Sequence, residues 1–508
     1  MRRVLLLGLS CALLLAMMGG CSSNPPTSRQ VPRFESGACT FKLGQGFVDG
    51  QNIRCGFLIV REDRANANSS IVKLAVAILK PSSTTPESDP VIYLSGGPGE
   101  SPLTDFAPLF TPDGVSYFFG NHDLILFDPR GVGGYSQPSL DCPELRESTY
   151  SALDQNLTPD QYDALYRTAM LQCHARLIKA GINLSLFTTY TSAADVHDLI
   201  QALGYQQVNL YGGSYGTRLA LEVMRDFPQH IRSVVLDSTL PPQVDLFTSV
   251  PDSAMRSFET LFNACDANAT CNHNYPHLQS TFYALADTLN AHPLTLQGVV
   301  DPFTNRSYTV LLNGWRFVDL FFLSLYDTSM LAQLPADIYA AHSGNTATLS
   351  TLYNAEMFTE DAISRGMWYA VECNDDAPFV SSQDVDIAEQ AFAPPIRAAD
   401  LFNLQTRLGI CQFWNVKAAA AGEQQPVVSA IPTLILEGEY DPITPPANGN
   451  LAAQTLSHSD VLLFPGTGHG VDFGPSSCPK NIVLAFLATP TRRPDSSCIA
   501  SLSEPAFT

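Results

Sequence analysis

The hexapeptide Tyr211-Gly212-Gly213-Ser214-Tyr215-Gly216 has the pattern of a turn that carries a nucleophilic serine. A largely apolar run (207–210) precedes it and an amphipathic stretch (217–227) follows, so the sequence predicts a strand, a tight turn and a helix. In such a G-x-S-x-G turn the serine hydroxyl is exposed above the edge of a sheet, and the glycines let the helix pack closely against neighbouring strands. We therefore interpret Ser214 as a nucleophile. A glycine-rich structural turn is the alternative interpretation.

A serine is a weak nucleophile unless a histidine accepts its proton and an acid orients that histidine. Two downstream segments supply these partners in the order serine, acid, histidine. In both, an apolar run ends in a loop that contains glycine: Asp441 follows 433–436, and His469 follows 461–464. Catalytic groups beyond the carboxyl ends of strands are typical of open α/β sheets. We predict that Ser214, Asp441 and His469 form one catalytic triad.

Both partners also have a simpler interpretation. Asp441 could cap a turn, and His469 could be an ordinary loop histidine. Three rival acids stand nearby: Glu437, Glu439 and Asp472. The first lies within or at the end of the predicted strand and the last follows the histidine, so these two fit the expected order less well.

Hydrolysis by a serine also needs backbone N–H groups that face the negative charge developing on the substrate oxygen. One donor is expected from Tyr215, directly after the nucleophile. The other is expected from the glycine-rich loop 95–99, which follows the predicted strand 91–94, and Gly96 and Gly97 are its candidate donors. A phosphate-binding loop is the competing idea. The sequence has neither G-x-x-x-x-G-K-[ST] nor complete G-x-G-x-x-G spacing, which disfavours that idea.

Five segments in the right order resemble the proline iminopeptidases and their tripeptidyl aminopeptidase relatives. They are Ser95-Gly96-Gly97-Pro98-Gly99, Asp128-Pro129-Arg130-Gly131-Val132-Gly133, Gly212-Gly213-Ser214-Tyr215-Gly216, Gly438-Glu439-Tyr440-Asp441-Pro442-Ile443-Thr444-Pro445 and Gly466-Thr467-Gly468-His469-Gly470. The resemblance covers residues 38–500 and implies the triad named above. Ser95 is a departure, since iminopeptidases usually carry histidine there, and Glu100-Ser101 is another. We interpret Asp128 and Arg130 as structural, in an ion pair or a hydrogen-bonded loop.

The resemblance implies an α/β-hydrolase fold, and the apolar runs agree with a mostly parallel, eight-stranded sheet with flanking helices. The strands are expected near 55–60, 72–79, 91–94, 124–127, 208–211, 234–237, 433–436 and 461–464. Helical patterns at 254–264, 277–289 and 315–325 predict a large, mostly helical cap between the predicted strands 234–237 and 433–436. The expected domains are 1–20 (lipoprotein signal peptide), 21–37 (tether), 38–240 (first part of the core), 241–428 (cap) and 429–508 (second part of the core).

The cap is expected to decide the choice of substrate. An exopeptidase that recognises a free N-terminus needs carboxylates for the ammonium group. The candidates are Glu372, Asp375, Asp376 and Glu100, of which the first three lie in a segment that resembles the tripeptidyl branch. A solvated acidic loop beside a disulfide is the alternative. Four aromatic residues could line an apolar pocket or belong to the core: Trp368, Tyr369, Phe379 and Trp414.

The N-terminus resembles that of a bacterial lipoprotein. Two arginines precede an apolar run (4–18), as in a signal peptide. This run is shorter than a membrane-spanning helix, which needs about 20 apolar residues. Small residues then precede Cys21, which we predict to be lipidated. Ordinary cleavage that leaves a free Cys21 is the alternative. The expected location is the bacterial cell envelope, anchored by lipid and facing the periplasm or the cell surface.

Cysteine usage agrees with export. Of the 12 cysteines, Cys11 lies in the predicted signal peptide and Cys21 at the lipidation site, which leaves an even number for disulfides. The sequence alone leaves the connectivity open. Pairing of neighbours along the chain, which closes the shortest loops, gives one candidate set: Cys39–Cys55, Cys142–Cys173, Cys265–Cys271, Cys373–Cys411 and Cys478–Cys498. None of these pairs has C-x-x-C spacing and no H-E-x-x-H is present, so no metal and no cofactor is predicted.

The net charge of −21 argues against nucleic-acid binding. The predicted triad, together with the resemblance to proline iminopeptidases and tripeptidyl aminopeptidases, implies a serine exopeptidase that releases proline, dipeptides or tripeptides from the N-termini of short peptides. A carboxylesterase with the same triad is the first alternative, and a non-catalytic lipoprotein binding module is the second. Short peptides and the membrane are the expected partners. The oligomeric state is not predicted.

Overall fold

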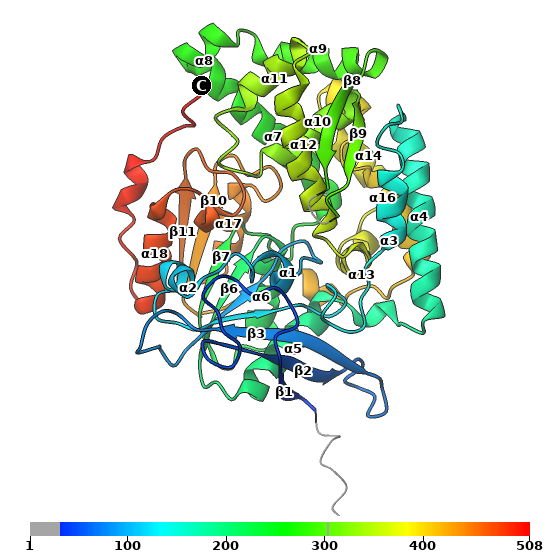
Figure 1. The fold of residues 1–508 in the computed structure, drawn as a ribbon. Helices are drawn as coiled ribbons and strands as arrows, with labels where there is room; N and C mark the ends of the chain where they lie inside the picture. Colours follow the sequence, from blue (N-terminus) through cyan, green and yellow to red (C-terminus); the bar gives the residue numbers. More distant parts are fainter. Residues whose placement is uncertain (1–30, 302–303, 508) are drawn as a thin grey trace, which may run out of the picture. The chain divides into compact units, whose positions relative to one another are not determined.

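The computed structural model describes residues 31–301 and 304–507. The fold below is that of the compact unit Pro32–Thr508. Its centre is a nine-stranded sheet in the order β1-β2-β3-β5-β4-β6-β7-β10-β11 (Figure 1). The strands are β1 (Arg33–Gly37), β2 (Ile53–Arg61), β3 (Ile71–Leu79), β4 (Val91–Leu94), β5 (Leu124–Phe127), β6 (Val208–Gly213), β7 (Ile231–Asp237), β10 (Thr433–Gly438) and β11 (Ser459–Phe464).

The sheet is antiparallel from β1 to β5 and parallel from β5 through β4 to β11. All eight predicted strands are present. The ninth, β1, corrects the prediction of eight, and it occupies the end of the segment 21–37 that was predicted to be a tether. Apart from Phe34 and Gly37 its residues are charged or polar, and three of the five are exposed, so this edge strand lacks the apolar pattern by which the other strands were found.

Helices cover both faces of the sheet. On one face α5 (Thr189–Leu203) and α6 (Tyr215–Asp226) pack against alternate side chains of the strands, including Ile92 and Leu94. On the other face α2 (Pro112–Phe119) and α18 (Ser477–Ala488) pack against the remaining side chains. The α/β-hydrolase architecture that the resemblance implies, a mostly parallel sheet with flanking helices, is therefore present.

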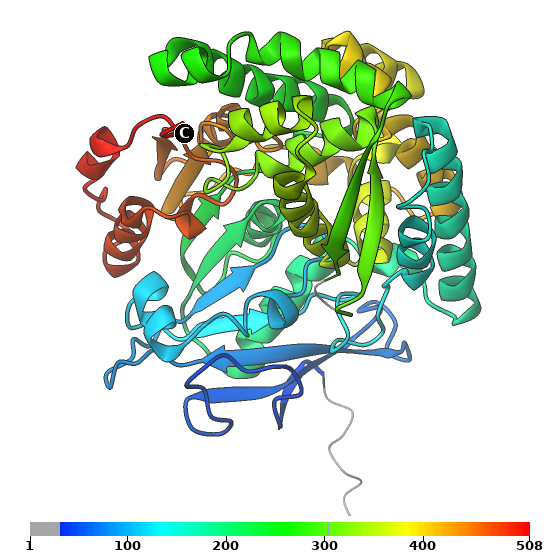
Figure 2. The same ribbon diagram turned by 45° about the horizontal axis from the view of Figure 1, so that its top comes forward.

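Between β7 and β10 the chain forms the cap, which occupies the upper part of Figure 1 and comes forward in Figure 2. Its helices are α7 (Leu246–Ala267), α8 (Ala269–Asn274), α9 (Leu278–Ala291), α10 (Gly314–Ser324), α11 (Leu334–His342), α12 (Thr346–Asp361), α13 (Arg365–Asp375), α14 (Ser382–Ala388), α15 (Pro394–Ala398) and α16 (Leu404–Trp414). The cap also holds a hairpin, β8 (Leu294–Val300) and β9 (Ser307–Leu312). A separate apolar core joins α7, α9, α10 and the hairpin.

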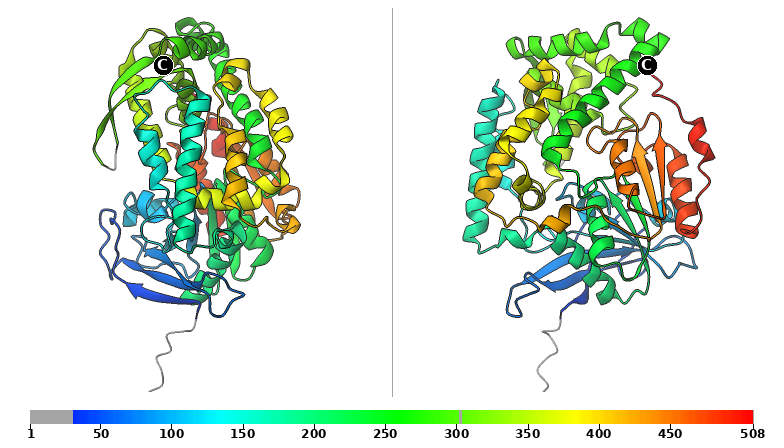
Figure 3. Two further views of the ribbon diagram at one scale, coloured as in Figure 1. Left: turned by 90° about the vertical axis from the view of Figure 1, so that its right-hand side faces the viewer. Right: turned by 180° about the vertical axis from the view of Figure 1, so that it is seen from behind.

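Two helices of the predicted core segment 38–240 stand with the cap. They are α3 (Pro143–Tyr150) and α4 (Pro159–Lys179), and α4 packs against α16 (Figures 1 and 3). Short helical segments also lie near the loops of the site: α1 (Pro102–Asp105) follows the glycine-rich loop, α17 (Pro446–Ala453) follows β10, and a 3₁₀ turn (Val471–Phe473) precedes α18.

All five predicted cysteine pairs are disulfides in the structure. Cys142–Cys173 joins α3 to α4, and Cys373–Cys411 joins α13 to α16. The predicted signal peptide 1–20, the lipidation site Cys21 and residues 22–30 of the tether lie outside the described residues. In the part of the chain that is described, no helix combines the length and apolar character needed to span a bilayer.

Candidate active site

Ser214 lies between β6 and α6, as the motif predicts. Its backbone angles, φ 55° and ψ −125°, belong to a region that residues with a Cβ rarely adopt. Its N–H donates to the carbonyl oxygen of Asp237 at the end of β7 (3.0 Å), which ties the turn to the next strand. A Cβ on Gly216 would lie 1.9 Å from the carbonyl oxygen of Leu94, so this glycine allows α6 to begin directly against β4.

His469 and Asp441 are in direct contact. The Nδ1 atom of His469 lies 2.8 Å from Oδ2 of Asp441. The other carboxylate oxygen, Oδ1, accepts hydrogen bonds from the N–H groups of Ile443 (3.0 Å) and Thr444 (2.8 Å), and the Thr444 hydroxyl donates to Oδ2. These bonds fix the carboxylate in its loop beyond β10, and the carboxylate in turn orients the imidazole.

The two groups shift each other's pKa. Burial opposes ionisation of Asp441, but the nearby His469 and the hydrogen bonds outweigh it and hold the pKa of the carboxyl below its ordinary value. Burial also disfavours a charged imidazole. The carboxylates of Asp441, Asp237 and Glu100 outweigh that effect and raise the pKa of His469. The pair is thus arranged to stabilise a proton on the imidazole.

None of the rival acids contacts the imidazole of His469. Glu437 accepts from the N–H of Thr239, and Glu439 accepts from the N–H of Gly466. Asp472 uses its own N–H to reach Asp237. Asp441 is therefore the carboxylate that the fold brings to the histidine.

In the glycine-rich loop, one of the two predicted oxyanion donors is wrong. The N–H of Gly96 donates to Oε2 of Glu100 (3.0 Å), so Gly96 is already engaged and does not face the site as an oxyanion donor. Gly97 has a φ of +100°, and it lines the cavity with Ser214. Tyr215 is the first residue of α6, where a backbone N–H has no partner within the helix.

Ser214 and His469 line one cavity of about 380 Å³ beneath the cap. Two of the four predicted substrate carboxylates, Glu100 and Glu372, line it as well. Tyr326, which follows α10 in the cap, closes one wall, and its ring centroid lies 5.0 Å from that of the imidazole. Ser214, Gly97 and the histidine of the histidine–aspartate pair thus line one cavity, which is the arrangement of a serine hydrolase.

Comparison with known families agrees with this geometry. Residues 89–472 match the family whose description is alpha/beta hydrolase fold. This protein belongs to the α/β-hydrolase family. The match includes the glycine-rich loop, the Ser214 turn, the whole cap and His469.

Three relatives of this α/β-hydrolase differ in the activity that their names state. The serine protease Hip1 of Mycobacterium tuberculosis is 26% identical over 468 residues, which cover 87% of this chain and 86% of that protein. A tripeptidyl aminopeptidase of Streptomyces lividans is 30% identical over 197 residues, covering 38% of this chain and 36% of the relative. Carboxylesterase B of Mycobacterium tuberculosis is 25% identical over 466 residues, covering 87% of this chain and 85% of the relative. Together they support a hydrolytic enzyme and leave peptide and ester substrates open.

Asp375 and Asp376, the other two predicted substrate carboxylates, do not line the hydrolase cavity. Asp375 is buried and accepts a hydrogen bond from the hydroxyl of Thr189 at the start of α5. Asp376 forms a buried ion pair with Arg218 of α6 (3.0 Å). Both carboxylates therefore join the cap to the core, because α13 directs them towards α5 and α6. The predicted role in binding the substrate is wrong for these two residues.

The structure also places the four aromatic candidates and the two residues that we interpreted as structural, Asp128 and Arg130. Of the four aromatic candidates, Trp368 lines the cavity, Tyr369 and Trp414 are buried in the core, and Phe379 is 43% exposed. Arg130 is paired, but with Asp195 (2.6 Å) and not with Asp128, which accepts instead from Ser101 and Leu103. A structural role for both is thus what their contacts indicate.

The α/β-hydrolase cavity contains charged residues that no motif in the sequence marked. Three further carboxylates line it: Asp163, Asp319 and Asp400. Burial raises the pKa of Asp163 and, together with the neighbouring Asp163 charge, that of Asp400 to about 7. Arg407 lies next to Glu372 and forms an ion pair with it. These residues are distant along the chain, and only the packing of α4, α10, α13 and α16 brings them together.

Proposed function

We propose that this protein is a serine exopeptidase that releases proline, dipeptides or tripeptides from the N-termini of short peptides. The observation that carries this proposal is the composition of one cavity. It contains Ser214 and His469 together with the half-buried Glu100 and the buried Glu372, whose carboxylates offer a cationic substrate group a site within the reach of the nucleophile.

In the proposed reaction, Nε2 of His469 takes the proton of the Ser214 hydroxyl while the serine oxygen forms a bond to the scissile carbonyl carbon. The N–H groups of Gly97 and Tyr215 stabilise the oxyanion. The C–N bond then breaks, and the leaving amine takes the proton from the imidazolium. Water, deprotonated by His469, attacks the acyl carbon. The bond between that carbon and the Ser214 oxygen then breaks, the N-terminal fragment leaves, and the proton returns from His469 to the Ser214 oxygen. Asp441 holds Nδ1 throughout.

Glu100 and Glu372 are the cavity carboxylates that we assign to the ammonium group. Burial raises the pKa of Glu100, which is opposed by His469 and by the Gly96 N–H. Burial raises the pKa of Glu372 to about 7, although the Arg407 charge opposes this. A bound ammonium group adds positive charge beside both carboxylates and favours their ionised forms. A neutral or blocked N-terminus provides no such compensation.

Digestion of a mixed peptide library, followed by mass spectrometry, tests the proposal directly. Removal of a fixed number of residues from free N-termini, together with no cleavage of N-acetylated peptides, is the expected result. The Ser214→Ala variant should lose the activity while keeping its melting temperature. Cleavage at internal bonds, or equal cleavage of free and acetylated peptides, would contradict an exopeptidase.

A carboxylesterase remains the second candidate, because carboxylesterase B resembles this chain over most of its length. The two activities separate on small substrates. An enzyme that hydrolyses p-nitrophenyl acetate but no aminoacyl or tripeptidyl anilide is an esterase. If wild type and Ser214→Ala are equally inactive on both classes, the non-catalytic binding module is the better account.

We also propose that lipidation of Cys21 anchors the protein to the bacterial cell envelope. The apolar run before Cys21 and the even number of cysteines beyond it support export. Cell fractionation and labelling with radioactive palmitate test this proposal. The wild type should be labelled and sediment with membranes, whereas Cys21→Ala should be unlabelled and leave the membrane fraction.

A further inference from the structure

The end of β7 takes no part in the proposed reaction, yet it lies between the two strands that lead to the nucleophile and to the acid. β7 pairs with β6, which ends directly before Ser214, and with β10, which ends shortly before Asp441. Its last residue, Asp237, and the following Ser238 are fully buried. No sequence motif marks either residue as functional.

Three consecutive N–H groups directly after the catalytic histidine donate to these two side chains. The N–H of Gly470 donates to the hydroxyl oxygen of Ser238 (2.9 Å). The N–H groups of Val471 and Asp472 donate to Oδ1 (2.7 Å) and Oδ2 (3.1 Å) of Asp237. Consecutive N–H groups in a turn form a concave site for an anion, and here the Asp237 carboxylate occupies it. The backbone that follows the histidine is therefore fixed to the end of β7.

Asp237 also holds the nucleophile. Its carbonyl oxygen accepts a hydrogen bond from the N–H of Ser214 (3.0 Å). The hydroxyl of Tyr211, three residues before Ser214 in β6, donates to Oδ2 of Asp237 (2.7 Å). Asp237 thus contacts the turn of the nucleophile through its backbone and the loop of the base through its side chain. The separation of Ser214 and His469 therefore depends on this one residue.

The Asp237 side chain also brings a negative charge close to His469. Its two backbone partners can only donate, and the Tyr211 hydroxyl donates as well, so these contacts suit the ionised carboxylate. Burial raises the pKa of this carboxyl, while the three donors and the nearby imidazole oppose the rise. Burial lowers the pKa of His469, and the charges of Asp441 and Asp237 are among the effects that outweigh it.

The other ionisable groups around this carboxylate do not cancel its charge. Burial raises the pKa of Glu437 and Asp472 well above the ordinary value, which favours their neutral forms. Burial has the same effect on the pKa of the Tyr93 and Tyr211 hydroxyls. The charge of Lys480 in α18 acts on Asp472. The imidazole itself faces ionisable groups from other loops: Asp441, Glu100 and Tyr326.

We propose that Asp237 and Ser238 are positioning residues of the catalytic base, which hold His469 at a fixed distance and orientation from Ser214. Ser238 acts through one hydrogen bond, and Asp237 acts through hydrogen bonds and through its charge. Asp441 orients the imidazole ring, whereas the end of β7 holds the backbone behind it. The inference rests on the serine–histidine reaction of the proposed function and applies to a peptidase and to an esterase alike.

A fluorophosphonate probe tests this inference, because it needs the serine and its base but no group that binds a peptide. The Ser214 oxygen forms a bond to phosphorus, fluoride leaves, and His469 takes the serine proton. The second-order rate constant is measured as a function of pH. The final extent of labelling counts the folded molecules, so the rate constant does not depend on how much of a variant is folded.

The two variants S238A and D237N should differ in a characteristic way. S238A should react about tenfold more slowly than the wild type with an unchanged acid limb, because the Gly470 N–H loses its acceptor and no charge changes. D237N should react about 100-fold more slowly, since its NH₂ group leaves one of the two backbone N–H groups without an acceptor. The acid limb of D237N should also move to lower pH, because loss of a negative charge lowers the pKa of His469.

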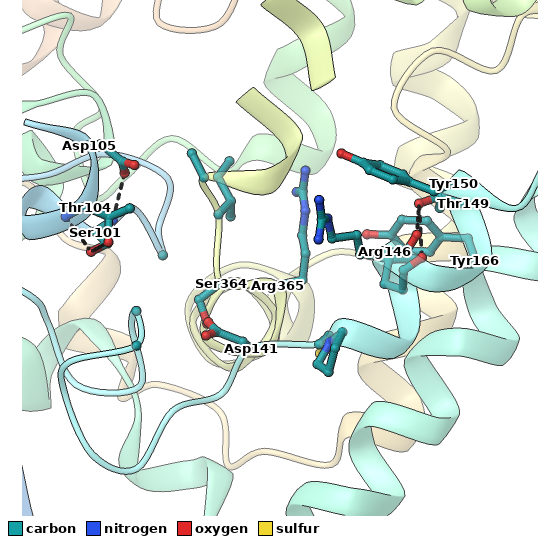
Figure 4. Close-up of a pocket in the computed structure, with 18 residues that line it drawn as sticks. Ser101, Thr104, Asp105, Asp141, Arg146, Thr149, Tyr150, Tyr166, Ser364 and Arg365 are labelled. Atoms are coloured by element: carbon teal, nitrogen blue, oxygen red, sulfur yellow. Dashed lines mark hydrogen bonds between the residues drawn. The ribbon is translucent and has the colours of Figure 1, made fainter. Parts of the chain in front are cut away.

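D141N is the control for the loss of a carboxylate. Asp141 lines a second cavity, of about 450 Å³, whose described lining residues include neither Ser214 nor His469 (Figure 4). D141N should therefore keep the wild-type rate constant and acid limb. Wild-type rate constants in both S238A and D237N, or a wild-type acid limb in D237N, would overturn the inference. An equal shift of the acid limb in D141N would overturn it too.

The probe also separates this inference from the choice of substrate. A wild type that reacts with the probe but cleaves no peptide contradicts the exopeptidase, and the variants still decide the role of Asp237 and Ser238. A wild type that does not react with the probe overturns both.

Discussion

At the residue scale, the histidine–aspartate pair determines how activity should depend on pH. The general base must be neutral to accept the serine proton, and Asp441 raises the pKa of His469 above its ordinary value of 6.5. Activity should therefore fall with decreasing pH at a point above 6.5. Asp441, which makes His469 a stronger base, thus also raises the pH below which activity falls.

Asp441→Asn should lower kcat by about 10⁴, because an amide in this position does not hold the imidazole in the required tautomer. Without the carboxylate charge, the pKa of His469 falls, so the acid limb of kcat/KM should move to lower pH. A pH profile of the residual activity measures both effects. An acid limb that stays in place would show that a group other than His469 controls it.

Glu372 and Asp375 provide a second comparison at the residue scale, because both belong to α13 and only Glu372 lines the cavity. Glu372→Gln should raise KM for peptides with a free N-terminus by about tenfold. Since burial raises the pKa of Glu372 to about 7, the wild-type KM should also increase as the pH falls below that value. Asp375→Asn should change the melting temperature without raising KM. Equal effects of the two substitutions on KM would contradict the assignment.

At the element scale, the positions of the strands could be predicted from the sequence, but which side of each helix faces the cavity could not. Each of the eight expected strands is a short apolar run bounded by turn residues, whereas the polar edge strand β1 gives no such signal. The acidic cluster at the end of α13 was visible in the sequence. Which of these carboxylates faces the cavity and which faces α5 or α6 depends on how α13 packs. The sequence also gives no sign that Glu372 pairs with Arg407, which lies 35 positions further along the chain.

The close approach of α6 to β4 makes a prediction for the Ser214 turn. In Gly216→Ala the new Cβ would meet the carbonyl oxygens of Leu94 (1.9 Å) and Ser95 (2.9 Å), so helix or loop must move. We expect a loss of about 1–3 kcal/mol in stability and a larger loss of activity, because the oxyanion loop moves too. Gly409→Ala on α16 is the control, since nothing lies within 4 Å of its Cβ position. Similar melting temperatures for both variants would contradict this account.

At the scale of the whole molecule, the cap supports the catalytic loops as well as covering them. The N–H of His469 donates to the carbonyl oxygen of Tyr326 (2.9 Å), and the N–H of Gly468 donates to the hydroxyl of Thr328 (2.9 Å). Arg256 of α7 donates to the carbonyl oxygens of Glu439 (2.6 Å) and Asp441. Two core loops that carry the acid and the base are therefore positioned by cap residues.

Arg256→Lys tests this coupling between cap and core. A single ammonium group cannot hold both carbonyl oxygens as the guanidinium fork does, so the Asp441 loop should lose one fixed contact. We expect kcat to fall by about tenfold with a smaller change in KM, since a displaced acid misorients His469 without reshaping the substrate cavity. Arg397→Lys is the matched control: Arg397 also donates to carbonyl oxygens, those of Glu389, Gln390 and Phe392, but all of them belong to the cap. Both variants should lower the melting temperature, and only Arg256→Lys should lower kcat. A cap that serves purely as a cover would give equal kcat values in the two variants.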